Sequence, residues 1–215
     1  MNYDNKPSHY YSKVRHEMLK YMPVGTKRIL EVGCGNGCLG EEIKKNAEVE
    51  IWGIEMMEDE AESAKKVLDK VFVGKCEDFL NELPDNYFDV IYFNDVLEHL
   101  FDPYSLLSSI KSKLSSNGVV ISSIPNMRYH NELRKLLIKK DWKYEQHGVM
   151  DFTHMRFFTQ KSIRRMYEDA GYSVLINEGI NKSKSLKPIL YNILFLFTQK
   201  DIFYLQFATV ASKKV

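Results

Sequence analysis

Short β-rich runs alternate with helical segments up to residue 125, and this alternation constrains the fold more than any other feature of the chain. The runs lie at residues 28–32, 49–54, 71–73, 88–93 and 119–124. Strands that alternate with helices at this spacing form right-handed βαβ units with parallel strands. Two further runs follow, at 172–176 and 203–211. We therefore predict an α/β fold, a doubly wound sheet of seven mostly parallel strands with helices on both faces.

The 215 residues suit a single domain, residues 1–215, with two parts that depart from the alternation. About residues 1–25 should contain an N-terminal helix, because apolar groups recur at helical spacing over 8–22 and Pro23 ends the pattern. About residues 126–158 mix His, Arg and aromatic residues without a clear strand. Since this insertion follows the fifth strand, at the carboxyl ends of the strands, we expect it to form a lid that contacts the substrate.

Charge and cysteine content exclude several classes of protein. The chain has 30 Lys+Arg against 29 Asp+Glu, a net charge of +1, so no nucleic-acid partner is expected. Three cysteines are too few for a disulfide framework, and Cys34 and Cys38 lack a second Cys/His pair at zinc spacing. The N-terminus is polar, and the apolar stretch 189–197 is too short to span a bilayer. We expect a cytoplasmic protein without a transmembrane segment.

Three glycines follow the first strand in the stretch EVGCGNG, residues 31–37. Glycine lets the backbone turn sharply and approach a ligand without a Cβ in the way. Glu55, at the end of the second strand, falls 20 residues beyond Gly35, where a carboxylate can accept hydrogen bonds from ribose hydroxyls. Gly35, Gly37 and Gly40 also satisfy the G-x-G-x-x-G dinucleotide pattern, so an NAD(P)-binding oxidoreductase is an alternative. The loop thus predicts a cofactor that contains a nucleoside.

Five segments, in their order along the chain, resemble the class I S-adenosylmethionine (SAM)-dependent methyltransferases. They read EVGCGNG (31–37), WGIE (52–55), FDVIYFNDVLEHL (88–100), LSSNGVVISSIPN (114–126) and DFTHMRFFT (151–159). The resemblance implies a Rossmann-like fold, SAM as the cofactor and methyl transfer as the reaction. A module that binds the cofactor without catalysis is the alternative within this family.

By this resemblance, the carboxyl ends of the strands supply the residues that bind SAM. Glu31, Gly33 and Gly35 would contact the amino-acid end of SAM, and Glu55 would contact its ribose. Met56, Cys76 and Glu77 would contact the adenine, and Asn94 would contact the methyl group. The family commonly has an Asp where this chain has Lys75. Glu77 or Asp78 would therefore have to bind the exocyclic amine of the adenine.

A second group of polar residues follows the fourth strand. Asp95, Glu98 and His99 stand at positions i, i+3 and i+4, so one helical turn would project them from the same face. Together with His154 they are similar to the acidic-x-x-Glu-His turn and later His of the metal-dependent methyltransferases that modify sugar hydroxyls of small RNAs. Ubiquinone-pathway O-methyltransferases share the turn, although this chain has Asp95 where a Glu is usual. The resemblance implies a divalent metal, Mg or Mn, held by Asp95, Glu98, His99 and His154.

Two alternatives to a metal stay open on the residues alone. Glu98 and His99 could brace the neighbouring loop as buried polar groups. His154, with His99 nearby, could instead act as a catalytic base without a metal, because a neutral imidazole takes up a proton near neutral pH.

The insertion at 126–158 predicts the class of acceptor. Arg128, Arg134 and Arg156 offer guanidinium groups that match phosphate oxygens, unless this stretch is only a solvated helix with a small aromatic core. The stretch DFTHMRFFT is similar to methyltransferases of bacterial surface-polysaccharide assembly, which implies polysaccharide biosynthesis. We therefore expect O-methylation of a sugar hydroxyl in a glycan or nucleotide-sugar precursor. A phenolic or other small-molecule hydroxyl is the alternative acceptor.

The segment 183–197 is rich in large apolar residues, and Lys182, Lys184 and Lys187 lie at its beginning. This pattern predicts a helix that packs on the sheet or at the seam of a homodimer. A weak peripheral contact with a membrane surface is the alternative, because lysines beside an apolar face also suit an interfacial helix.

Overall fold

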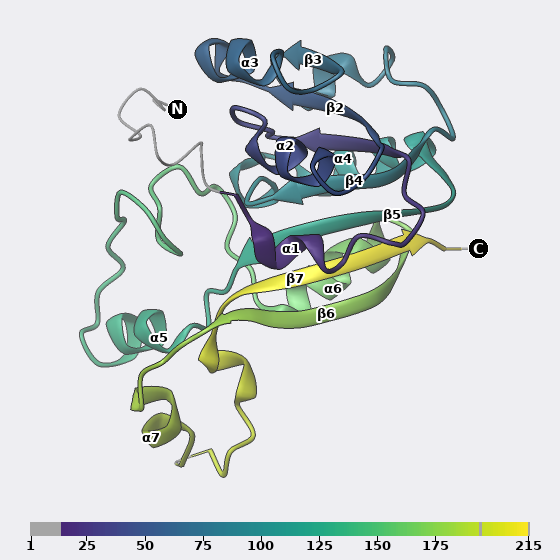
Figure 1. Cartoon of the computed structure of the whole chain (residues 1–215). Helices are drawn as coiled ribbons and strands as arrows, with labels where there is room; N and C mark the ends of the chain where they lie inside the picture. The colour runs from purple at the N-terminus through teal and green to yellow at the C-terminus, as the bar shows by residue number, and fades with distance from the viewer. Residues whose placement is uncertain (1–13, 194, 215) are drawn as a thin grey trace.

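The computed structural model describes residues 14–193 and 195–214, and seven strands of this part form one sheet (Figure 1). The strand order is β3-β2-β1-β4-β5-β7-β6. The strands are β1 Arg28–Val32, β2 Glu50–Glu55, β3 Lys70–Val73, β4 Phe88–Asn94, β5 Leu114–Pro125, β6 Tyr172–Lys182 and β7 Tyr204–Lys213. Neighbours among β1 to β5 are parallel, whereas β7 runs antiparallel to β5 and β6. The predicted doubly wound, mostly parallel sheet is confirmed.

Helices cover both faces of this sheet. They are α1 His16–Leu19, α2 Cys38–Lys44, α3 Glu58–Ala64, α4 Pro103–Ile110, α5 His130–Leu137, α6 Gln160–Asp169 and α7 Lys187–Ile193, with 3-10 turns η2 Cys76–Phe79, η3 Leu97–His99, η4 Lys111–Lys113 and η5 Lys200–Phe203. Ile29 packs with Ile43 of α2 in one apolar cluster, and Leu30 packs with Ile163 of α6 in another. Because successive residues of a strand point to opposite faces, one strand serves both cores.

Several boundaries differ from the prediction. Of the helix predicted over 8–22, residues 8–13 lie outside the described residues, and α1 covers only His16–Leu19. α3 ends at Ala64 instead of Leu68, because the chain turns there and packs Leu68 in the core beside Gly53. β5 begins earlier than predicted, at Leu114, which pairs with Phe88 of β4. β6 is longer than predicted, since its antiparallel pairing with β7 continues beyond the apolar run.

The insertion after β5 begins and ends at the same place. Asn126 and Phe158 form a parallel β-bridge, and the backbone N–H of Met127 donates to the carbonyl of Phe158 at 2.8 Å. Between these ends lie α5 and a long irregular stretch. The insertion is thus a loop closed at its base beside the carboxyl end of β5, where a lid was predicted.

The segment between β6 and β7 forms α7, which is shorter than the helix predicted over 183–197. α7 contacts α5 and η5, and Figure 1 shows α5 and α7 beyond the ends of β6 and β7 rather than over the sheet. Packing of this helix on the sheet was therefore a wrong prediction. Within residues 14–193 and 195–214, no helix combines the length and the apolar character needed to cross a bilayer.

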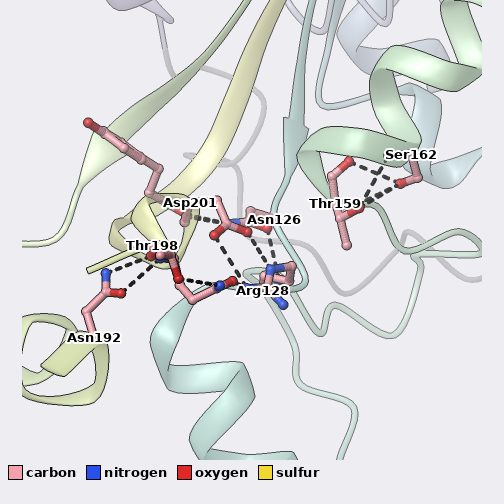
Figure 2. Close-up of polar contacts among 9 residues, drawn as sticks. Asn126, Arg128, Thr159, Ser162, Asn192, Thr198 and Asp201 are labelled. Atoms are coloured by element: carbon pink, nitrogen blue, oxygen red, sulfur yellow. Dashed lines mark hydrogen bonds and ion pairs between the residues drawn. The ribbon is translucent and has the colours of Figure 1, made fainter. Parts of the chain in front are cut away.

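α6 begins at a capping box, which Figure 2 shows. The hydroxyl of Thr159 accepts a hydrogen bond from the backbone N–H of Ser162 at 3.3 Å, and the hydroxyl of Ser162 accepts one from the N–H of Thr159 at 2.8 Å. These bonds satisfy N–H groups that the first turn of a helix leaves without partners. The cap thereby fixes where the insertion ends and α6 begins.

We expect Thr159→Ala to lower the free energy of unfolding by about 1 kcal/mol, the usual cost of removing an N-cap oxygen. Urea denaturation followed by circular dichroism measures this change. Thr159→Ser is the matched control, because it keeps the hydroxyl and should retain most of the stability. An unchanged denaturation midpoint in Thr159→Ala would show that the capping box does not stabilise α6.

Candidate active site

The glycine turn after β1 packs tightly against the chain that follows β4. Gly33 and Gly35 have φ angles of +72° and +51°, in the left-handed region that favours glycine. A Cβ on Gly33 would lie 2.5 Å from Val96 Cγ2, well inside the normal separation of two carbon atoms. The backbone N–H of Gly33 also donates to the carbonyl of Ile54 at 2.8 Å. A larger residue at Gly33 would therefore push the turn away from this edge of the sheet.

Glu55, the last residue of β2, connects two loops of the site. Its Oε2 accepts a hydrogen bond from the N–H of Gly35 at 2.8 Å. Its Oε1 accepts bonds from the N–H groups of Met56 and Met57 at 2.8 and 2.9 Å. The carboxylate is buried, so these three donors hold it at the predicted ribose position, between the glycine turn and the start of α3.

Buried polar atoms without hydrogen-bond partners gather at the same edge of the sheet. They include one carboxylate oxygen of Glu31 on β1 and both amide atoms of Asn94 on the neighbouring β4. The side-chain oxygen of Asn36 also lacks a partner; this residue was not predicted, and its position between two loop glycines was the available signal. Because buried polar groups normally have partners, these atoms indicate a place for a polar ligand.

The three residues predicted to contact the adenine differ in how exposed their side chains are. Met56 is 43% exposed, and Glu77 is also exposed. The thiol of Cys76 is buried in the apolar core, and this burial raises its pKa to about 12. Of Cys76 and Glu77, only Glu77 therefore has a side chain that a ligand could contact.

Two backbone hydrogen bonds assemble the second half of the site. The N–H groups of Met155 and Arg156 donate to the carbonyl of Glu98 at 2.9 and 3.0 Å. Upstream of them, Asp151 Oδ1 accepts bonds from the N–H and the hydroxyl of Thr153 at 2.9 and 2.7 Å. This turn fixes the chain just before His154. The stretch DFTHMRFFT is thus brought against η3, as the predicted pairing of the two motifs requires.

Each imidazole of the site has a backbone carbonyl opposite Nδ1. His99 Nδ1 lies 3.2 Å from the carbonyl of Thr153, and His154 Nδ1 lies 2.9 Å from that of Val149. A carbonyl can only accept, so Nδ1 donates and Nε2 carries the lone pair of the neutral ring. The two ring centroids are 4.7 Å apart. Both histidines can therefore offer Nε2 as a metal ligand or as a base.

Glu98, His99 and His154 form a compact group whose ligand atoms all lie within 4.8 Å of one another. Glu98 is 1% exposed, and neither of its carboxylate oxygens has a hydrogen-bond partner. Burial, and then the nearby charge of Asp95, raise the pKa of Glu98 well above its ordinary value. A buried carboxylate beside two imidazoles therefore fits a cation, which would stabilise its ionised form.

Asp95, the fourth predicted ligand, does not lie in this group. Its Oδ1 accepts hydrogen bonds from the hydroxyl of Ser123 at 2.9 Å and from Gln206 Nε2 at 2.6 Å, and its Oδ2 is paired with Arg15. Asp95 also has a φ of +54°, an uncommon conformation for a residue other than glycine. Its carboxylate ties the end of β4 to β5, β7 and the residue before α1. The structure thus brings together three of the four residues predicted to hold a metal, and Asp95 is not among them.

Two of the three predicted arginines of the insertion bind the protein's own groups, whereas the buried Nε of the third, Arg134, has no hydrogen-bond partner. Arg128 pairs with Asp201, and its guanidinium donates a further bond to the side-chain oxygen of Gln199 (Figure 2). Arg156 donates from Nε and Nη2 to the carbonyl of Phe101, at 3.1 and 2.6 Å. The prediction that these two residues present phosphate-binding forks is therefore wrong. Their partners come from distant parts of the sequence, which the local pattern could not reveal.

Aromatic side chains surround His154 on the insertion side. Phe157 lies with its ring centroid 6.4 Å from that of His154, and Trp142 and Tyr144 lie 5.3 and 6.1 Å from Phe157. An open hollow of about 620 Å³ adjoins this cluster and is lined by residues 143–147 and Phe152. Aromatic side chains and this hollow therefore lie on the insertion side of the Glu98–His99–His154 group.

A family model described as a methyltransferase domain matches residues 3–176, most of the chain. The chain belongs to this methyltransferase family. It is a SAM-dependent methyltransferase, as its sequence predicted, and not an oxidoreductase. The Rossmann-like fold described above is the fold of the solved SAM-dependent methyltransferases that it matches.

Proteins similar to this methyltransferase have been named for their reactions or solved as structures. A ubiquinone biosynthesis O-methyltransferase of Neisseria meningitidis serogroup C is 26% identical over 162 residues, 72% of this chain and 67% of the relative. The Aeromonas salmonicida protein of the same name is 28% identical over 186 residues, 82% and 76% of the two chains. A SAM-dependent methyltransferase from Archaeoglobus fulgidus shares the fold with a TM-score of 0.73, at 20% identity over 96% of this chain and 95% of that one. The resemblance to polysaccharide methyltransferases is not confirmed by these proteins.

In the ligand-free methyltransferase, Glu31 should make stability fall as the pH rises. Burial, and then the charge of Glu55, raise the pKa of Glu31 in the folded protein from 4.5 to about 8. The folded state therefore binds this proton more tightly than the unfolded state, so its contribution is complete below about pH 4.5 and is lost as the pH passes about 8. Glu31→Gln has no proton to lose and should flatten this dependence.

Urea denaturation of the ligand-free protein at about pH 6 and about pH 9 measures the effect, which should amount to a few kcal/mol. Glu77→Gln is the matched control, since Glu77 is exposed and the substitution should leave the pH dependence intact. Equal pH dependence in the wild type and in Glu31→Gln would contradict the raised pKa.

Proposed function

We propose that this methyltransferase transfers the methyl group to a hydroxyl oxygen of a small aromatic molecule, with a divalent cation at the acceptor site. The observation that carries the proposal is the buried group of Glu98, His99 and His154 beside the aromatic side chains of the insertion. The similarity to ubiquinone biosynthesis O-methyltransferases supports oxygen as the acceptor atom. It also favours a small-molecule acceptor over the sugar hydroxyl expected from the sequence.

The unpartnered atoms at the ends of β1 and β4 fit the amino-acid end of SAM. Glu31 would bind its ammonium group, which would stabilise the ionised form of this otherwise neutral carboxyl. Asn94 has both a donor and an acceptor to satisfy on the methyl side. Glu55 would accept from the ribose hydroxyls, and Met56 would cover the adenine. When bound, SAM supplies a methyl carbon already activated by its positively charged sulfur.

The cation would be held by one carboxylate and two imidazoles, from Glu98, His99 and His154. Nitrogen-containing ligand sets suit manganese or ferrous iron better than magnesium, which prefers oxygen ligands. The buried, unpartnered carboxylate of Glu98 supports this assignment, because its ionised form needs a positive partner. A divalent cation at this point supplies Lewis-acid stabilisation of a hydroxyl that loses its proton. The carbonyls of Thr153 and Val149 would hold the two rings with Nε2 as the ligand nitrogen.

The acceptor class is proposed from the side chains around this group. A ring of the substrate could stack beside Trp142, Tyr144 and Phe157, which favours an aromatic molecule over a sugar. A sugar phosphate would need positive groups, but Arg128 and Arg156 are bonded to the protein itself. Two neighbouring ring hydroxyls could approach one cation together, so a catechol is the preferred acceptor.

The test is methyl transfer from SAM with a labelled methyl group to caffeate, a catechol, and to methyl glucoside, a sugar. We expect label on a hydroxyl oxygen of caffeate, detected by mass spectrometry of the product. Trp142→Ala should raise the KM for caffeate at least severalfold while leaving adenosylhomocysteine binding, measured by calorimetry, unchanged. Leu175→Ala, an exposed change on β6, is the matched control. Label on methyl glucoside alone, or on neither compound, would overturn the proposed acceptor.

The metal hypothesis predicts that a chelator suppresses turnover and that added manganese restores it. Glu98→Gln and His154→Ala should each weaken manganese binding at least tenfold, because each removes one of three ligands. Electron paramagnetic resonance of added manganese measures binding independently of activity. Asp95→Asn should retain manganese binding, since Asp95 lies outside the group. If chelation has no effect and His154→Ala is inactive at every metal concentration, His154 acts as a base without a metal.

A further inference from the structure

The end of the molecule formed by α5 and α7 exposes an unusual number of large apolar side chains. At the end of α5 they are Leu136, Leu137 and Ile138. Directly before, on and after α7 they are Leu186, Ile189, Leu190, Ile193, Phe195, Leu196 and Phe197. Leu196 is 85% exposed and Leu186 77%. The two helices are in contact, because His130 at the start of α5 binds the hydroxyl of Ser183 and packs near the ring of Tyr191. We call this combined area the α5–α7 surface.

The most exposed part of this surface is a tight turn that the protein holds in place. Asn192 is 1% exposed, and its side chain donates to the carbonyl of Gln199 at 2.8 Å and accepts from the N–H of Gln199 at 3.0 Å (Figure 2). Leu196 and Phe197 both have positive φ angles, +49° and +57°. Bulky residues in this conformation cost free energy, so other contacts must compensate. The turn therefore presents Phe195, Leu196 and Phe197 to solvent in a defined arrangement.

The α7 part of the α5–α7 surface carries charge of one sign, whereas the exposed Asp141 follows the apolar end of α5. Residues 179–200 contain four lysines and no Asp or Glu, and all four lysine side chains are exposed: Lys182, Lys184, Lys187 and Lys200. Lys139 and Lys140 are exposed directly after the apolar end of α5. The chain as a whole has a net charge of only +1, so this concentration of positive charge is local. An apolar surface edged by lysines complements a bilayer that carries anionic headgroups.

We propose that the α5–α7 surface docks on an anionic phospholipid bilayer, with the turn at Phe195–Phe197 inserted among the lipids and the lysines at the headgroups. A second copy of this chain is a poorer occupant. A twofold interface across α7 would bring the lysines of one copy near those of the other, where residues 179–200 offer no acidic partner. In a bilayer, by contrast, each lysine finds a negative headgroup while the apolar tip leaves water.

This docking would position the acceptor side of the active site. The side-chain amide of Asn126 donates to the carbonyls of Asp201 and Tyr204, at 2.9 Å each, and Arg128 is paired with Asp201 (Figure 2). The first residues of the insertion are thereby joined to η5, which follows the apolar turn. The apolar turn and the base of the insertion are therefore linked through η5. The bilayer would therefore lie on the insertion's side of the molecule, and this inference does not depend on which acceptor is used.

The experiment measures cosedimentation of the full chain with vesicles of phosphatidylcholine alone and of phosphatidylcholine mixed with phosphatidylglycerol. We expect binding to the mixed vesicles that weakens as salt is added, because salt screens the lysines. The double variant Leu196→Ser with Phe197→Ser should reduce binding at least about tenfold, since both apolar side chains would no longer be buried. Lys184→Gln and Lys187→Gln should each reduce it about fivefold.

Val24→Ser is the matched control, because Val24 is fully exposed but precedes β1, at the opposite end of the sheet. It should bind vesicles as the wild type does. Every variant should keep the wild-type thermal unfolding temperature and adenosylhomocysteine affinity, so a loss of vesicle binding cannot come from unfolding. Wild-type binding in the Leu196/Phe197 variant would overturn the proposal. The proposal would also be overturned if the wild type bound neither kind of vesicle and formed a dimer in analytical ultracentrifugation that the Leu196/Phe197 variant does not form.

Discussion

The carbonyl oxygen of Glu98 accepts backbone hydrogen bonds from Met155 and Arg156, and the acceptor side of the molecule depends on this contact. It joins a short turn after β4 to a stretch more than fifty residues later in the chain. Together with the contact between His99 Nδ1 and the carbonyl of Thr153, it places His154 near Glu98 and His99. Backbone bonds are well suited to this task, since they hold the chain while leaving the side chains available for chemistry. The side chains of Glu98, His99 and His154 come together because these contacts hold the main chain that carries them.

Two carboxyl groups at the same edge of the sheet have oxygen atoms that find no hydrogen-bond partner within the folded protein. Glu31 and Glu98 are buried, and burial raises the pKa of each. An unpaired buried polar group costs free energy that the apolar cores on both faces of the sheet must offset. A ligand that carries positive charge removes this cost when it binds. With the proposed ligands bound, the free energy lost by the ligand-free protein would be recovered as affinity, at Glu31 for the ammonium group and at Glu98 for the cation.

The antiparallel strand β7 connects this edge to the rest of the molecule. Gln206 on β7 donates to Asp95, which also pairs with Arg15 before α1. At its start, β7 follows η5, whose Asp201 holds Arg128 of the insertion. Residues from the two ends of the chain therefore support the turn that leads to Glu98. A change in β7 would be expected to disturb the acceptor side more than the cofactor side.

The sequence alone determined the strands and the glycine turn after β1, and the family resemblance indicated that Glu98 and His99 act together with His154. The strands and the turn follow from short-range constraints, which are apolar periodicity and the need for glycine at positive φ. Only the tertiary structure decided the partners of Asp95 and Arg128. Their partners Arg15 and Asp201 are 80 and 73 residues away along the chain. A charged side chain binds whichever opposite charge the fold brings near it, and local pattern carries no information about that distance.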